Sequence, residues 1–159
     1  MSHFYSRILL LAIDCSATAC GGKSDPAQAA TDDDDPRHVR HELMEGVRDA
    51  AKPVGAMLKG EAEFDADTLM SSLKVFHDAS GEFGDLFPPG TETGMDTEAA
   101  PAIWEDREGF DQALADWRAA VEKAMDAKPA TLEDAKPVVG PIFNTCKNCH
   151  VTYRIEEEG

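Results

Sequence analysis

The chain has 159 residues, with 15 basic and 31 acidic side chains, a formal net charge of −16 and four cysteines. This length suits one domain with a single core. The negative charge disfavours contact with a phosphate backbone, so nucleic acid is excluded as a partner. The four cysteines divide between the two ends of the chain, which excludes a disulfide framework.

Residues 1–20 have the composition of an export signal. Arg7 precedes the apolar run Ile8–Ile13, which is too short to remain as a membrane-spanning helix. The stretch Ala17–Gly22 resembles a bacterial lipoprotein processing site. Two outcomes therefore stay open. One is ordinary cleavage in this region, and the other is lipidation of Cys20, which would tether the protein to a membrane.

Residues 21–35 are predicted to form a flexible acidic tether. Small, proline and acidic residues dominate this stretch, and it offers no large apolar side chain to bury. The tether ends in four aspartates, Asp32–Asp35, followed by Pro36. We expect these aspartates at the start of the first helix, where negative charge and an early proline are both favourable.

Two amphipathic helices are predicted in the first half of the remaining domain, residues 36–159. The first spans about 36–59, with a local disturbance at Pro53 and a stop at Gly60. The second begins near Asp65, a suitable N-cap, and reaches about residue 84. Apolar residues recur at helical spacing in both: Val39, Leu43, Val47, Ala50, Val54 and Met57, then Leu69, Leu73, Phe76 and Phe83.

A long loop rich in proline, glycine and threonine follows, and two more helices come after it. The third is predicted over about 101–127, and the fourth runs from 131 or 132 to about 156. Pro137 and Pro141 predict an irregular start to the fourth helix. Four such segments with no competing strand pattern indicate an all-α, antiparallel four-helix bundle.

The run Cys146-Lys147-Asn148-Cys149-His150 has the spacing of a covalent haem-attachment site. On a helix, thiols at i and i+3 and a histidine at i+4 share one face, so the sulfurs can bond the vinyl groups of a porphyrin while the imidazole reaches its iron. The alternatives are a chance pair of thiols, a surface disulfide or half of a zinc site. A zinc site needs further ligands, and no second Cys-x-x-Cys or paired histidine follows.

No methionine, histidine or cysteine follows His150 in the sequence. A second protein ligand to the iron would therefore have to come from upstream. This order favours a bundle in which the last helix carries haem c and an earlier helix covers its other face.

Residues 40–154 resemble the class II cytochromes c, which comprise cytochrome c′ and the low-spin cytochrome c-556 type. The resemblance rests on Lys59-Gly60 with Phe64-Asp65, on Pro101-Ala102-Ile103-Trp104 after the loop, and on the stretch from Cys146 to Arg154. It implies a periplasmic four-helix bundle with one covalent haem c. The c-556 type is the nearer of the two.

The resemblance implies a role for each matching residue. Cys146 and Cys149 would form the thioethers, and His150 would be the proximal iron ligand. Met44 stands at the first-helix position that faces the distal side of the haem. That position is usually apolar in cytochrome c′, which leaves the iron five-coordinate, and is methionine in the c-556 type. Arg40 matches an arginine that lies near a haem propionate in relatives.

Several of these positions have a plainer interpretation as well. Met44 could be core filler, because methionine is common in bundles, although its family position favours a ligand. Trp104 and Tyr153 are expected either to pack against the haem or to belong to the ordinary core. His41 and His77 are expected at the surface rather than on the iron.

Three functional hypotheses follow. With Met44 bound to iron, the protein would be a periplasmic electron carrier whose redox partners have basic surfaces. The alternative is a five-coordinate cytochrome c′ that binds nitric oxide or carbon monoxide, and the third is an acidic lipoprotein with an incidental motif. An enzyme is not predicted, because no nucleophile and base are paired and no phosphate loop is present. A homodimer stays open, since many relatives pair through their first two helices.

Overall fold

The computed structural model describes residues 32–95 and 97–155, and its fold over these residues is all-α. The predicted export signal, Cys20 and the tether up to residue 31 lie outside the described residues. The end of the predicted tether is structured, because Asp32–Asp34 form a short 3-10 helix, η1. The helices that follow are α1 (Pro36–Lys59), α2 (Ala66–Glu82), the 3-10 helix η2 (Phe83–Leu86), α3 (Ala102–Glu105), α4 (Arg107–Ala127) and α5 (Leu132–Tyr153).

Helix α1 has the bounds predicted from the sequence. The Asp35 carboxylate accepts a hydrogen bond from the Arg37 backbone N–H at 2.8 Å, and Pro36 occupies the first turn, where its missing N–H costs nothing. Gly60 ends the helix in the left-handed conformation, with a φ of 75°. The helix continues through Pro53, so the expected disturbance is limited to the N–H that proline lacks.

Helix α2 begins as predicted, because Asp65 caps it by accepting from the Thr68 backbone N–H at 2.6 Å. Its α-helical part ends at Glu82, slightly before the predicted end. The chain tightens there into η2, so Phe83 still packs against the core although it is no longer α-helical.

The third predicted helix is wrong in one respect, since the structure has two helices in that region. The break lies at Asp106, whose φ of −127° and ψ of 62° are not helical. The Asp106 side chain accepts from the Gly109 backbone N–H at 3.1 Å and so starts α4 afresh. Trp104 and Phe110 lie on opposite sides of this break.

Helix α5 is more regular than predicted and ends earlier. Pro137 and Pro141 lie inside it without interrupting it, and both are exposed, so water can solvate the backbone carbonyls that they leave unpaired. The helix stops at Tyr153 because Arg154 is extended and forms an antiparallel bridge with Ala99. The predicted end near residue 156 was therefore too late.

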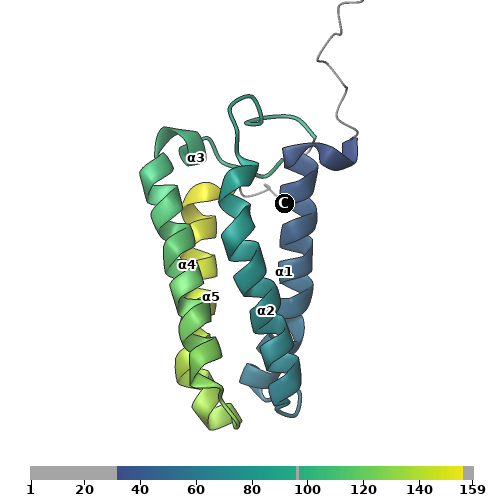
Figure 1. Cartoon of the computed structure of the whole chain (residues 1–159), viewed down its shortest axis with the longest axis vertical. Coiled ribbons are helices and arrows are strands. Elements are labelled where there is room, and N and C mark those ends of the chain that lie inside the picture. The colour runs from purple at the N-terminus through teal and green to yellow at the C-terminus, as the bar shows by residue number, and fades with distance from the viewer. Residues whose placement is uncertain (1–31, 96, 156–159) are drawn as a thin grey trace, which may run out of the picture.

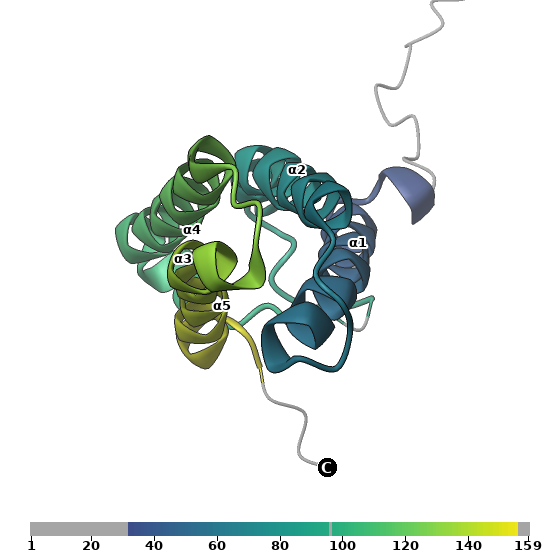
Figure 2. The same cartoon turned by 90° about the horizontal axis from the view of Figure 1, so that it is seen from below.

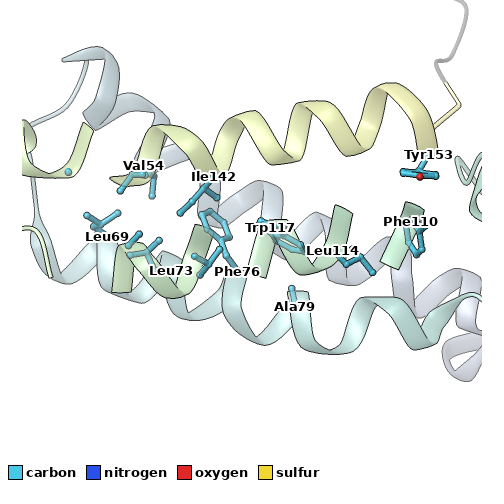
Figure 3. Close-up of a cluster of buried hydrophobic side chains, with 14 of the residues drawn as sticks. Val54, Leu69, Leu73, Phe76, Ala79, Phe110, Leu114, Trp117, Ile142 and Tyr153 are labelled. Carbon is cyan, nitrogen blue, oxygen red and sulfur yellow. The ribbon is translucent and has the colours of Figure 1, made fainter. Parts of the chain in front are cut away.

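The long helices α1, α2, α4 and α5 stand side by side, and the loop between η2 and α3 crosses one end of the bundle (Figures 1 and 2). Buried side chains form a core along the bundle axis, from Val54 and Leu69 to Phe110 and Tyr153 (Figure 3). The central positions Leu73, Val121 and Val139 are fully buried. Among the described residues, none of the helices combines the length and the apolar character that a membrane span requires.

Candidate cofactor site

A cavity of about 550 Å³ lies between the helices near the end of the bundle that the long loop covers. Its walls come from α1, α2, α4, α5 and the loop, and they are mostly apolar. Pockets of about 300–1,000 Å³ with such walls are typical sites for small molecules and cofactors. The cavity is therefore the candidate site.

Helix α5 contributes Cys146, Cys149, His150 and Tyr153 to the cavity wall. Their spacing of three, four and seven residues places all four on one face of the helix, as the motif predicted. Burial, and next the neighbouring Cys149, raises the pKa of the Cys146 thiol to about 11. Burial also raises the pKa of Cys149. Both thiols are therefore protonated at neutral pH, unlike the thiolates of redox-active or zinc-binding cysteines.

His150 lies at the edge of the cavity. The residue as a whole is exposed, but the partial burial of its ring, and next the charge of Arg154, lowers the pKa of the imidazole. The ring is thus favoured in its neutral form, which is the form that binds metal. In the described part of the chain, His, Cys, Asp and Glu side chains form no group of three that could hold a metal ion by themselves.

Helix α1 forms the opposite wall, with Arg40, His41 and Met44. Met44 is half-buried, packs against the core and lies one turn after Arg40. The structure thus brings the predicted residues of α1 and α5 to two sides of one cavity. His41 is exposed, as predicted, but it lines the cavity too, whereas His77 does not.

Arg40 is buried and holds the long loop in place. Its guanidinium donates to the backbone oxygens of Leu86 at 3.2 Å and Thr91 at 2.7 Å, and to the hydroxyls of Thr91 and Thr97. The Arg40 Cζ also lies 4.8 Å from the ring centre of Phe87. Burial, and next the charge of Arg37, lowers the pKa of Arg40.

Trp104 takes part in this arrangement but does not line the cavity. Its ring lies 5.8 Å from that of Phe87 and the same distance from the Arg40 Cζ, so it supports the wall from behind. The loop residues that do line the cavity were missed by sequence reasoning; they are Phe87, Met95, Thr97, Glu98 and Ala99. No periodic pattern in the loop could have indicated them.

Tyr153 combines two tasks. It is buried, and its hydroxyl donates to Asp106 Oδ2 at 3.2 Å, which ties the end of α5 to the start of α4. Next to it, the Arg154 Nε donates to Glu98 at 2.7 Å and the Ile155 N–H donates to the Glu98 backbone oxygen at 2.7 Å. The segment that carries His150 is therefore fastened on two sides.

The charges of the cavity differ from those of the whole chain. Four arginines and two glutamates line it, which gives a formal charge of +2, against −16 for the chain. Asp35, outside the lining, pairs with Arg37, so Arg40 is the lining arginine that forms no ion pair among the described residues. An apolar cavity with such a buried arginine suits a flat apolar ligand that carries carboxylates, and haem has this chemistry. Together with paired thiols and an imidazole on one helix face, the residues present fit a covalent haem. The four arginines and two glutamates of the cavity lining are Arg37, Arg40, Arg48, Arg154, Glu45 and Glu98.

Comparisons with known proteins show the family and the fold of the chain. The family described as Cytochrome C′ matches residues 35–154. A cytochrome c′ of Rhodopseudomonas palustris is 37% identical over 121 residues, which are 74% of this chain and 80% of that protein. A cytochrome c-556 of Agrobacterium tumefaciens is 30% identical over 118 residues, covering 74% and 95%. The solved structure of R. palustris cytochrome c′ superposes with a TM-score of 0.75 at 35% identity, covering 78% of this chain and 98% of that one.

Proposed function

The chain belongs to the Cytochrome C′ family, whose members bind one covalent haem c, and on that premise we propose that it is an electron carrier in which Met44 and His150 complete the coordination of the iron. In this proposal Cys146 and Cys149 form the thioethers. Bound haem supplies one-electron chemistry through its ferric and ferrous states.

The observation that carries the proposal is the placement of Met44. Its side chain lines the cavity from α1, while His150 and both cysteines line it from α5. A thioether and an imidazole on opposite walls are the ligand pair that raises the reduction potential of a c-type cytochrome. If Met44 and His150 both bound the iron, exogenous ligands would have no free coordination site.

The remaining residues would hold the group in place and keep water from it. The Nε–H of Arg40 has no hydrogen-bond acceptor among the described residues, and this N–H could serve a propionate. Phe87 and Phe110 close the apolar end of the cavity, with their ring centres 5.0 Å apart. A preformed pocket that excludes water limits how far the surrounding groups must reorganise when the charge of the iron changes.

The absorption spectrum of the haem-loaded protein tests this function. We expect a low-spin ferrous α band and a ferric sulfur-to-iron band near the red end, and Met44→Ala should remove the latter. Met70→Ala is the matched control, because Met70 is also half-buried but does not line the cavity. A wild-type spectrum that is high-spin and unchanged by Met44→Ala would contradict the proposal.

A second candidate function is the binding of nitric oxide or carbon monoxide by a five-coordinate iron. The similarity to R. palustris cytochrome c′, at 37% identity, favours this candidate. Met44 would then shield the iron without binding it. Rapid binding of carbon monoxide by the untreated ferrous protein would support this alternative over electron transfer.

The cellular setting belongs to the same proposal. The export signal in residues 1–20 suggests the periplasm, with the tether at Cys20 as an open alternative to ordinary cleavage. The charge of −16 favours redox partners with basic surfaces. Pairing of two chains through α1 and α2 is proposed from the family alone. Sedimentation of the mature protein would test the pairing, and mass spectrometry of its N-terminus would distinguish lipidation of Cys20 from ordinary cleavage.

A further inference from the structure

Met95 has a backbone conformation that is unfavourable for a residue other than glycine, in a turn that the Thr97 N–H closes by donating to the Gly94 backbone oxygen at 3.1 Å. Its φ is 50°, and Lys128 is the only other non-glycine residue with a positive φ among the described residues. The left-handed region is costly for a side chain with a Cβ, and such outliers often mark functional positions. Met95 is also 43% exposed, which leaves a large apolar side chain in water.

The loop around Met95 is anchored on both sides. Before it, the Arg37 Nη1 donates to the Thr93 backbone oxygen at 2.8 Å. After it, the Arg40 guanidinium donates to the Thr97 hydroxyl. Both arginines belong to α1, so Thr93 and Thr97, on either side of Met95, are held against that helix.

Met95 lies at the opening of the cavity. It lines the cavity together with Met44 and His150, yet nearly half of its surface faces solvent. It is not part of the buried core or of the partly buried side chains packed against that core. Core packing therefore does not account for the apolar side chain at this place, whereas covering an apolar opening would.

We propose that Met95 is a gate, which limits by size the ligands that can enter the cavity toward the wall formed by Met44. The inference rests on the proposed function only in that haem occupies the cavity. Ligation by Met44 is a separate matter, because a gate at the opening acts on any ligand that enters from solvent. The structure supports a fixed gate, since Arg37 and Arg40 hold both of its flanks.

The test uses the haem-loaded ferrous protein with Met44→Ala, so that the iron is accessible whether or not Met44 binds it. In this background, the association rates of carbon monoxide and tert-butyl isocyanide are compared with and without Met95→Gly. Glycine tolerates the left-handed conformation, so the substitution removes the side chain without straining the loop. Lys128→Gly is the matched control, because Lys128 has a φ of 44° and does not line the cavity.

We expect Met95→Gly to raise the isocyanide rate by about tenfold, equivalent to a barrier lowered by about 1.4 kcal/mol. Carbon monoxide should gain less, because a smaller ligand passes the gate more easily. Met95→Leu should keep the barrier, and Lys128→Gly should change neither rate. Equal gains for both ligands, or no gain with Met95→Gly, would overturn the proposal. Fast carbon monoxide binding by the chain with Met44 intact would refute Met44 ligation alone and leave the gate standing.

Discussion

Gly109→Ala tests the contact that joins α4 to the end of α5. Gly109 is the third residue of α4, and a Cβ there would lie 2.2 Å from Asp106 Oδ2 and 2.6 Å from the Tyr153 hydroxyl. Alanine in place of a helical glycine normally stabilises a protein by about 0.5–1 kcal/mol. At this position the added methyl must displace Asp106, Tyr153 or both.

The structure gives the size of the opposing effect. Moving Asp106 removes the N-cap of α4, which costs about 1 kcal/mol. It also breaks the hydrogen bond from the buried Tyr153 hydroxyl, which costs about 1–2 kcal/mol because the carboxylate is charged. These losses exceed the helix-propensity gain. Gly109→Ala should therefore lower the free energy of unfolding by about 1–2 kcal/mol.

Denaturant unfolding of the haem-loaded protein measures this change. The control is Gly46→Ala in α1, where Gly46 is exposed and a Cβ would meet no atom within 4 Å. That variant should be stabilised by about 0.5–1 kcal/mol. In the Tyr153→Phe background, Gly109→Ala should cost less than in the wild type. If Gly109→Ala stabilises as much as Gly46→Ala does, the contact between Asp106 and Tyr153 contributes nothing and the reasoning fails.

Three further substitutions test the cap of α1, the core and the loop. Hydrogen bonds from Arg37 lower the pKa of Asp35 from 3.8 to about 2, so the charged pair stabilises the fold above about pH 4 and this contribution is lost as the pH falls toward about 2. The unfolding free energies of wild type and Asp35→Asn, which keeps a capping side chain, should thus converge over that window. If the two unfolding free energies still differ near pH 2, the charged pair is not the source of the difference and the reasoning is wrong. Leu73→Ala, at a fully buried position, should cost about 2–5 kcal/mol in denaturant unfolding, whereas Val75→Ala, at an exposed position of the same helix, should cost about 0.5 kcal/mol or less. Arg40→Lys should speed amide hydrogen exchange of Thr91 and Thr97, because lysine lacks the planar fork that bonds the loop. Arg48→Lys should leave this exchange unchanged, because Arg48 is largely exposed at the cavity lining and pairs with Glu45 of its own helix.

The helices could be predicted because their signals are local. Apolar spacing of three and four, aspartates at the N-caps and Gly60 at a C-cap act within a few residues of where they stand. The break at Asp106 was missed because the apolar pattern runs on from Trp104 to Phe110 across it. Only the backbone geometry shows that Asp106 caps a new helix there.

The candidate site likewise has one part that local sequence signals predicted and another part that they could not predict. The face that α5 presents follows from the spacing of Cys146, Cys149 and His150, so the sequence predicted it. Val39, Leu43 and Val47 were expected in the core, but all three are only half-buried. Leu43 and Val47 pack against the core, and Val47 also lines the cavity. The contacts of Arg40 with the loop join residues 46 to 57 positions apart, and no local pattern reports such pairs.

The charge of the cavity links the site to the stability of the fold. Its lining carries +2 in a chain of −16, but Arg37, Arg48 and Arg154 each pair with a carboxylate, so the positive charge of the lining that lacks an ion-pair partner in the described chain is that of Arg40. Arg40 is buried there, and its hydrogen-bond partners among the described residues are neutral oxygens, while the charges of Asp35 and Glu92 act on it from a greater distance. A buried cation that no carboxylate contacts directly is costly, and a ligand with two carboxylates would remove part of that cost. Binding of such a ligand must then stabilise the folded chain by linkage, beyond the effect of covering the apolar walls.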